Sequence, residues 1–212
     1  MTAPQGFDAY ARIFFPFVAA DGADGADGAD GADGADGQEF ITWRELARRN
    51  GRIAHALMEH ETIAAGPDGG DAGETCCGSL SAGQFGALLP ILTRHTSSSE
   101  GWFLLWDGFG DLNERVFSDA WPKVRHPTRS FFLLRGPLGA YDAFPDQPSY
   151  WWPEDRAWIV ATEIDFCWTY VGGRSGLIEK LLSSETLEAL PTKLSDKPFY
   201  DSDVLNAALD EA

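Results

Sequence analysis

The hydrophobic positions in the second half of the chain alternate with a period of two, as they do along β-strands. Four segments are rich in aromatic and β-branched residues and bounded by Gly, Pro or Asp, which predicts strands at Trp102–Trp106, Ser130–Arg135, Trp158–Glu163 and Phe166–Val171. The third segment alternates two faces, with Trp158, Val160 and Thr162 on one and Ile159, Ala161, Glu163 and Asp165 on the other. A continuous strand to Val171 would be unusually long, so a hairpin or bulge is expected near Ile164–Phe166.

Helical periodicity appears before and after these strands. Thr42-Trp-Arg-Glu45 is a capping-box pattern, and it begins a predicted helix from about Thr42 to Glu61 with a weak point at Gly51. Ser81-Ala-Gly-Gln84 begins a second helix that reaches His95, and Pro90 is expected to kink or divide it. Shorter helices are predicted at Ser175–Ser183, Glu185–Leu190 and Asp203–Asp210.

The order of these elements predicts the fold class. Helices come first, strands follow, and helices return, with no long helical crossover of the kind that joins parallel strands. We therefore expect a single α+β domain over residues 1–212, with a mainly antiparallel sheet flanked by helices.

A tandem Ala-Asp-Gly repeat occupies Asp21–Gly37. Its aspartates recur at every third position, whereas an EF-hand loop needs carboxylates at every second position and a closing Glu. The repeat is therefore interpreted as a flexible loop at 20–38, with a second loop at 63–79. Since lengthening a surface loop costs little free energy, Ala9–Ala19 and Gln38–Trp43 are expected to flank one expanded turn.

The charge is strongly negative, with 33 Asp and Glu against 16 Lys and Arg and a formal net charge of −17. Such a chain repels phosphate backbones and anionic lipid surfaces, which disfavours nucleic-acid and membrane partners. The field favours a basic protein or a small cationic ligand, although high charge also serves solubility alone.

The three cysteines, Cys76, Cys77 and Cys167, form no CxxC motif and make a poor disulfide framework. The N-terminal segment lacks a signal-peptide pattern, and no apolar run is long enough to span a membrane. These features predict a reduced, soluble, cytoplasmic protein. No zinc-ligand spacing, GxGxxG or Walker loop is present, so no metal and no cofactor is expected.

From Phe103 onward, the segments FLLWDGFGD, RSFFLLRGPL, WWPEDRAWIVATEIDFCWTYVGG and LEALP resemble a group of actinobacterial hypothetical proteins of unassigned function. No activity is implied by that resemblance. In layout and acidity alone, the chain is similar to the SMI1/KNR4-like (SUKH) superfamily. That similarity would imply an α+β fold and a role like that of toxin-immunity proteins.

The stretch from Trp151 to Gly173 holds four of the eight tryptophans. Trp158, Phe166 and Trp168 fit a core, whereas Trp151 and Trp152 lie in the Pro-rich segment PDQPSYWWPED, where paired indoles are typical of binding hot spots or of packing over a sheet edge. The first hypothesis is a non-enzymatic binding protein with an acidic, tryptophan-rich face. Its candidate residues are Trp102, Trp106, Trp151, Trp152, Asp155, Arg156, Glu163 and Asp165.

The second hypothesis is a hydrolase or transferase that uses Glu163 and Asp165 as a carboxylate pair, with His95 as a further candidate. Paired carboxylates perform acid–base chemistry when proximity separates their pKa values. A structural salt bridge to Arg135 or Arg156 is the alternative, and the sequence leaves both open.

Overall fold

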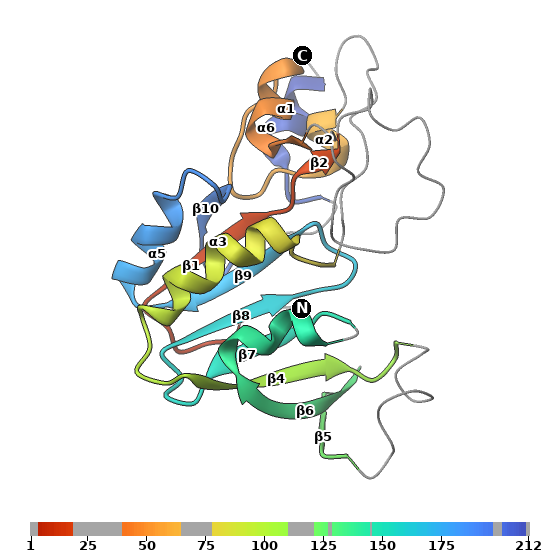
Figure 1. Cartoon of the computed structure of the whole chain (residues 1–212). Coiled ribbons are helices and arrows are strands. Elements are labelled where there is room, and N and C mark those ends of the chain that lie inside the picture. Colours follow the sequence, from red (N-terminus) through yellow and green to blue (C-terminus); the bar gives the residue numbers. More distant parts are fainter. Residues whose placement is uncertain are drawn as a thin grey trace.

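The computed structural model describes residues 4–18, 40–64, 78–109, 121–126, 129–144, 146–196 and 201–210. Within these ranges, eight strands form one antiparallel sheet in the order β10-β1-β9-β8-β7-β4-β6-β5 (Figure 1). The strands are β1 (Ala9–Phe14), β4 (Glu100–Trp106), β5 (Lys123–Arg125), β6 (Ser130–Pro137), β7 (Tyr150–Pro153), β8 (Trp158–Thr162), β9 (Trp168–Gly173) and β10 (Ala189–Thr192). Helices pack against the sheet, so the predicted α+β class is confirmed.

One face of the sheet carries the larger core. Helix α3 (Ala82–Thr93) lies across this face, between α5 (Ser175–Leu182) and the 3-10 helix η2 (Leu138–Ala143) (Figure 1). Alternate strand residues point toward these helices and are fully buried, among them Ile13, Phe103, Trp151, Val160 and Val171.

The opposite face is covered over only part of its width. A helical lobe of α1 (Trp43–Arg49), α2 (His60–Ala64) and α6 (Val204–Asp210) gathers at one end of the molecule (Figure 1). The second core cluster joins α1 and α2 to side chains of β1 and β9, including Tyr10, Phe14, Trp168 and Tyr170. The lobe thus covers the β1–β9 half. The cluster reaches β7 only through partly buried Tyr150, and no residue of β4, β6 or β5 belongs to it.

The single helix predicted from Thr42 to Glu61 is wrong, because the chain forms two short helices instead. Thr42 does cap α1, since its hydroxyl accepts from the backbone N–H of Glu45 at 3.1 Å. Helix α1 then ends at Asn50, and Gly51 follows with φ +66°, a conformation that favours glycine. In contrast, the predicted capping box at Ser81 and Gln84 is confirmed, and α3 is one helix that contains Pro90.

Two further predicted elements are corrected. The Pro-rich segment around Trp151 and Trp152 forms β7, which lies between β4 and β8 rather than in a loop. The helix predicted at Glu185–Leu190 is absent, and β10 pairs there with β1. The expected hairpin near Ile164–Phe166 is confirmed, because β8 and β9 pair antiparallel on either side of it.

The flanks of the Ala-Asp-Gly repeat come together as expected. Strand β2 (Phe17–Val18) pairs antiparallel with β3 (Phe40–Ile41), so residues on the two sides of the repeat face each other. The repeat loop at 20–38 lies outside the described residues, as does most of the loop at 63–79, of which Ile63 and Ala64 belong to α2.

The expectation of reduced cysteines is wrong for Cys167, which is disulfide-bonded. Beside it, the backbone N–H of Gly78 donates to the carbonyl of Phe166 at 2.8 Å. Gly78 has φ +82°, and a Cβ at this position would lie 2.5 Å from the carbonyl oxygen of Ile164. The chain therefore approaches the β8–β9 turn more closely than any other residue type would allow.

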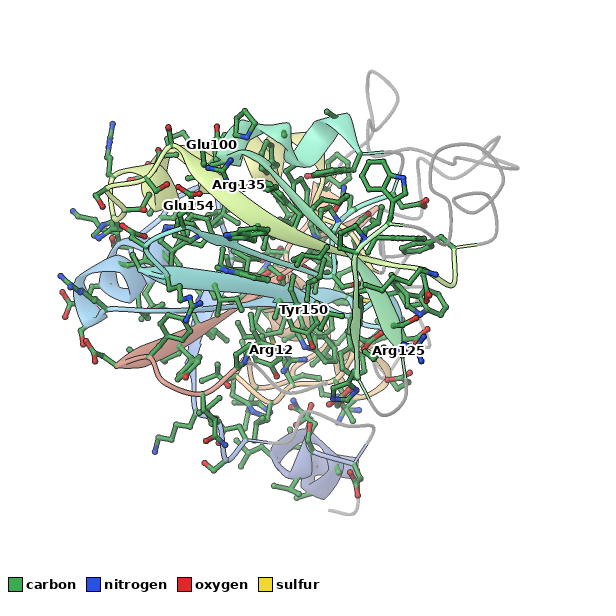
Figure 2. The ribbon with its side chains drawn as sticks, turned by 90° about the horizontal axis from the view of Figure 1, so that it is seen from below. Arg12, Glu100, Arg125, Arg135, Tyr150 and Glu154 are labelled. Atoms are coloured by element: carbon green, nitrogen blue, oxygen red, sulfur yellow. The ribbon has the colours of Figure 1, made fainter. Side chains whose placement is uncertain are left out.

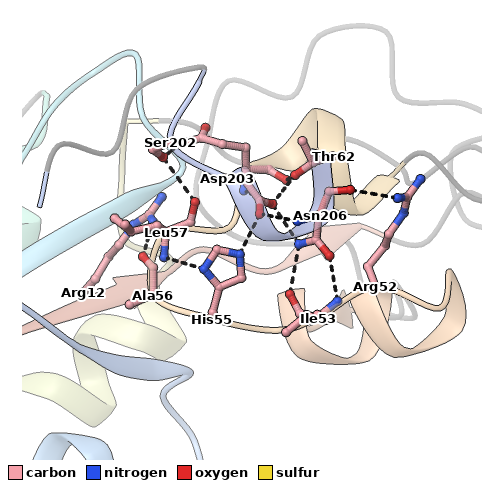
Figure 3. A network of polar contacts seen from close by, with 11 residues as sticks. Arg12, Arg52, Ile53, His55, Ala56, Leu57, Thr62, Ser202, Asp203 and Asn206 are labelled. Carbon is pink, nitrogen blue, oxygen red and sulfur yellow. Dashed lines mark hydrogen bonds and ion pairs between the residues drawn. The ribbon is translucent and has the colours of Figure 1, made fainter. Parts of the chain in front are cut away.

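Within the helical lobe, a polar network joins α6 to α2 and to the segment between α1 and α2 (Figure 3). The buried carboxylate of Asp203 accepts from the backbone N–H of Asn206 at 3.0 Å, from that of Glu59 at 3.2 Å and from the hydroxyl of Thr62, and it contacts His55 Nε2 at 2.6 Å. Burial opposes ionisation of Asp203, but hydrogen bonds from Thr62, Asn206 and His55 outweigh it and lower its pKa. Asp203 therefore both caps α6 and ties it to the segment between α1 and α2.

Candidate ligand-binding groove

A groove of about 560 Å³ opens on the sheet face that the helical lobe leaves uncovered. Its lining comes from five neighbouring strands (β5, β6, β4, β7 and β8), the β7–β8 turn and the N-terminal segment. The lining residues are Pro4, Gln5, Phe7, Leu104, Val124, Arg125, His126, Phe131, Tyr150, Trp152, Arg156, Trp158 and Ile159.

Strand alternation places an apolar floor in this groove. Leu104 of β4 stands opposite Tyr150 of β7, and Trp152 follows two residues later on the same face. Phe131 of β6 packs edge-to-face against Tyr150, with ring centroids 5.8 Å apart. Because these strands are apolar on both faces, one set of side chains enters the core and the other set forms the floor.

One wall of the groove is the segment before β1. The hydroxyl of Tyr10 donates to the carbonyl of Pro4 at 2.9 Å and accepts from the backbone N–H of Phe7 at 3.2 Å. A Cβ on Gly172 would lie 2.8 Å from the Tyr10 ring and 2.9 Å from the Phe7 ring. Glycine at this position therefore makes the space in which the wall lies against β9.

The charged residues of the groove have one sign. These are Arg125 and Arg156, which line it beside His126, and no carboxylate is among its lining residues in the described part of the chain. Figure 2 shows Tyr150 between Arg125 of β5 and the cluster of Glu100, Arg135 and Glu154 at the other end of the sheet. A chain of net charge −17 thus has a groove bordered by cationic side chains.

Arg156 is held in a constrained turn. Its φ of 56° lies in the left-handed region, which is uncommon for a residue other than glycine. The preceding Asp155 anchors the turn, because its carboxylate accepts from the Thr96 hydroxyl and from the Ser97 backbone N–H and hydroxyl, each at 2.8 Å. Partial burial opposes ionisation of Asp155, but these hydrogen bonds and one from Ala157 lower its pKa to about 2.

The phenol of Tyr150 remains protonated in this environment. Burial raises its pKa to about 12, the carboxylate of Glu163 adds to that rise, and Arg129 acts in the opposite direction. Tyr150 therefore contributes an aromatic surface and a neutral hydroxyl to the groove, and it cannot act as a base near neutral pH.

The structure separates the two tryptophans that the sequence placed on one binding face. Trp151 is fully buried between Phe103, Tyr141 and Trp158 and cannot touch a partner. Trp152 points the other way and lines the groove. The correction follows from the identification of this segment as a strand, since neighbouring residues of a strand face opposite sides.

The other candidate residues lie around the groove rather than within it. Half-exposed Trp102 stands opposite Trp152 and beside Arg135 in the sheet register. Trp106 packs edge-to-face against Phe109 at 5.2 Å, and its ring lies 5.0 Å from the guanidinium carbon of Arg129. Of the eight residues proposed from sequence, only Trp152 and Arg156 line the groove.

Glu163 and Asp165 do come together, through a shared cation. Arg129 contacts the Glu163 carboxylate with one terminal nitrogen and Asp165 with the other, the latter at 3.4 Å. Asp165 is largely exposed, and within the described part of the chain no hydrogen bond or ion pair joins His95 to either carboxylate. The pair has the geometry of a structural salt bridge. The expected counter-ion is corrected, since Arg135 contacts Glu154 at 2.6 Å instead.

Five further residues of the groove are not predicted as site residues from the sequence: Leu104, Arg125, Phe131, Tyr150 and Ile159. Their signal is that the neighbouring strands β7 and β4 are apolar on both faces. That signal becomes visible only when β7 is recognised as a strand. Among the described residues, no group of three or more His, Cys, Asp or Glu side chains is placed to hold a metal ion.

No family model, no curated protein and no solved structure matches this chain. In the part of the chain that the structure describes, no helix combines the length and apolar character needed to cross a membrane. The function is therefore inferred from the geometry of the groove.

Proposed function

We propose that this protein is a non-enzymatic binding protein whose ligand occupies the groove on the uncovered half of the sheet. The observation that carries the proposal is the groove itself, about 560 Å³ in volume and floored by Leu104, Tyr150 and Trp152. Small-molecule sites in proteins usually have volumes of about 300–1,000 Å³, apolar linings and a few placed polar groups.

The alternative of a hydrolase or transferase receives less support from the geometry. Glu163 and Asp165 are bridged by Arg129, and neither lines the groove. Acid–base catalysis needs a titratable group within hydrogen-bond reach of a bound substrate. Besides the two arginines, the described lining residues offer only His126 and the high-pKa phenol of Tyr150.

Other expectations from the sequence stay predictions. A basic protein partner and an immunity-like role are predictions that rest on the net charge of −17, whereas the groove has a different chemistry because its charged groups, Arg125 and Arg156, are cationic. The cytoplasmic location depended partly on reduced cysteines. The disulfide at Cys167 removes that support, because structural disulfides are typical of oxidising compartments.

The proposal is tested by chemical-shift mapping on ¹⁵N-labelled protein with a library of small aromatic and acyl compounds. We expect hits to shift the backbone amides of Leu104, Tyr150 and Ile159 and the indole N–H of Trp152. The indole N–H of Trp151 serves as an internal control, because this ring is buried on the other face of the same strand. A library that shifts none of these groove signals, or hits that gather on another surface, would contradict the proposal.

A further inference from the structure

We propose that the groove binds an amphipathic organic anion, in which a flat aromatic or acyl body carries one acidic group and that group is held by Arg156. The inference rests on the proposed function, since it names the class of ligand for the same groove. It follows from the floor, from the charges at the two ends, and from the contacts that hold Arg156 in place.

The floor selects an apolar body. Trp152 and Tyr150 present aromatic surface from β7, and Leu104 and Ile159 add aliphatic surface from the strands on either side. Aromatic side chains supply large contact area at low conformational cost, and they stack on flat ligands. A strongly hydrated ligand without an apolar part would leave this surface without a partner.

Arg156 is available to an anion because its acidic neighbours are already engaged. Glu154 pairs with Arg135 at 2.6 Å, and Asp155 is saturated by hydrogen bonds from Thr96 and Ser97. Among the described residues, no carboxylate forms an ion pair with Arg156, although it lies directly after two acids. The guanidinium is the side chain best suited to hold a carboxylate or sulfonate with two hydrogen bonds.

The turn also fixes the backbone of Arg156 at the rim of the groove. The backbone N–H of Arg156 donates to the carbonyl of Pro153 at 2.9 Å, and Asp155 ties the turn to the segment after α3. A binding residue whose backbone is already fixed loses less conformational entropy when the ligand arrives. Arg156 is the residue of this turn with a left-handed backbone conformation, and backbone strain of this kind is often found at functional positions.

Arg125 provides positive charge at the far end of the groove. It pairs in register with Ser130, beyond the Trp106 end of β4, whereas Arg156 follows Pro153, which pairs with Gly101. The seven residues of β4 separate these ends by roughly 20 Å at the usual rise per residue. Its neighbours Lys123 and Arg129 contact Asp107 and Glu163, while no ion pair of Arg125 exists in the described ranges. One acidic group therefore binds at Arg156, and Arg125 acts on it only through its field.

The overall charge of −17 opposes the approach of an anion, but it acts mainly on the rate of encounter. At physiological ionic strength, charges separated by more than about 8 Å are largely screened. Among the described lining residues, the two arginines are positive, and Glu163, whose charge reaches Tyr150, is paired with Arg129. The local field therefore decides the sign of the ligand.

Two fluorescent probes with the same ring system test this inference. 8-Anilinonaphthalene-1-sulfonate carries one sulfonate, and N-phenyl-1-naphthylamine is the same aromatic body without it. Titration at 50 mM NaCl should give at least tenfold tighter binding of the sulfonate. The preference should shrink at 500 mM NaCl, because salt screens an exposed ion pair.

Three matched substitutions locate the effect. Arg156→Gln should weaken the sulfonate about tenfold and leave the neutral probe unchanged, which is the loss expected for one charge-assisted contact. Arg125→Gln should weaken the sulfonate about threefold or less. Arg174→Gln removes the same charge from an exposed arginine at the N-terminus of α5, outside the groove, and should change neither probe.

Trp152→Ala separates this inference from the proposed function, because it should weaken both probes. If neither probe responds to Trp152→Ala, the groove is not the binding site and both proposals fall. If both probes respond to it but bind equally, or Arg156→Gln has no effect, the anionic ligand class is wrong while the groove remains a binding site. Near-UV circular dichroism of each variant confirms that its core is intact.

Discussion

The two halves of one sheet face carry similar aromatic residues, but the helical lobe covers only one of the halves. Over β1 and β9, aromatic side chains such as Phe14 and Trp168 are sealed by the helical lobe, whose Trp43 is fully buried. Over β7 and β4, Tyr150 and Trp152 border an open groove. An apolar strand face is therefore not always part of the core. It becomes core where another element covers it, and it stays open to a ligand where none does.

Arginine shows the same contrast. Arg12 in the covered half is fully buried, and its guanidinium carbon lies 3.7 Å from the centre of the Trp168 ring. Burial lowers the pKa of Arg12 to about 10, against the raising effects of Tyr170, Glu59 and Asp203. Arg156 in the open half is exposed to solvent and has none of this enclosure. Arg12 is thus part of the packed interior of the covered half, whereas Arg156 is available to a ligand in the open half.

The largest expected effect separates the two halves by a pair of tryptophan substitutions. Trp43→Ala should lower the free energy of unfolding by about 3–5 kcal/mol, because it removes a buried ring and the 2.7 Å hydrogen bond from its indole to the Phe15 carbonyl. Trp152→Ala should cost only about 1 kcal/mol, because this ring is half-exposed. Urea unfolding of the two variants with the disulfide intact measures both values, and equal losses would show that the groove half is packed like a core.

A smaller loss is expected from the clamp on α6. Asp203→Ala should destabilise the protein by about 2–3 kcal/mol, because it removes an N-cap and leaves buried donors without an acceptor. Amide hydrogen exchange in 204–210 should accelerate first, and probe binding in the groove should not change. Asp203→Asn keeps the N-cap and should lower the free energy of unfolding by about half as much as Asp203→Ala. Loss of groove binding in either variant would mean that the two halves are coupled.

The turn that carries Arg156 should show a distinctive acid titration. Carboxyl NMR of Asp155 should give a midpoint at about pH 2. Because the unfolded value is about 3.9, the contribution of Asp155 to stability is complete above about pH 4 and is lost as the pH falls toward 2. Ser97→Ala removes one of the donors and should raise the midpoint. An unperturbed midpoint in the native protein would show that the turn is not anchored.

The smallest effect concerns the floor of the groove. Glu163→Gln should lower the pKa of Tyr150 from about 12, because it removes a negative charge that disfavours the phenolate and leaves Arg129 beside the ring. Absorbance titration at alkaline pH, taken as the difference from Tyr150→Phe, isolates this residue. An unchanged or higher pKa would mean that Arg129 and Glu163 do not reach the phenol.

Much of the fold was predictable because local sequence patterns determine where several helices and strands begin and end. Thr42 and Ser81 begin helices through hydroxyl caps, and the flanks of the repeat pair as β2 and β3. Strand β7 was missed because prolines surround it, and its identity depends on hydrogen bonds to β4 and β8 that local sequence does not encode. Strand β10 was not predicted either, because its sequence has a helical pattern and its strand conformation depends on pairing with the distant strand β1.

The groove was less predictable than the fold. Its lining comes from chain segments as distant as Phe7 and Ile159, and these meet only after the sheet has assembled. The sequence singled out Trp152 and Arg156 by their composition. It could not tell Trp151 from Trp152 without the knowledge that both lie on one strand.

The central claim is tested most directly by a crystal structure of the protein with 8-anilinonaphthalene-1-sulfonate bound. We expect the ring system to lie against Trp152 and Tyr150, with the sulfonate within hydrogen-bond distance of Arg156. A probe bound over the helical lobe of α1, α2 and α6, or one whose sulfonate points away from Arg156, would contradict the account.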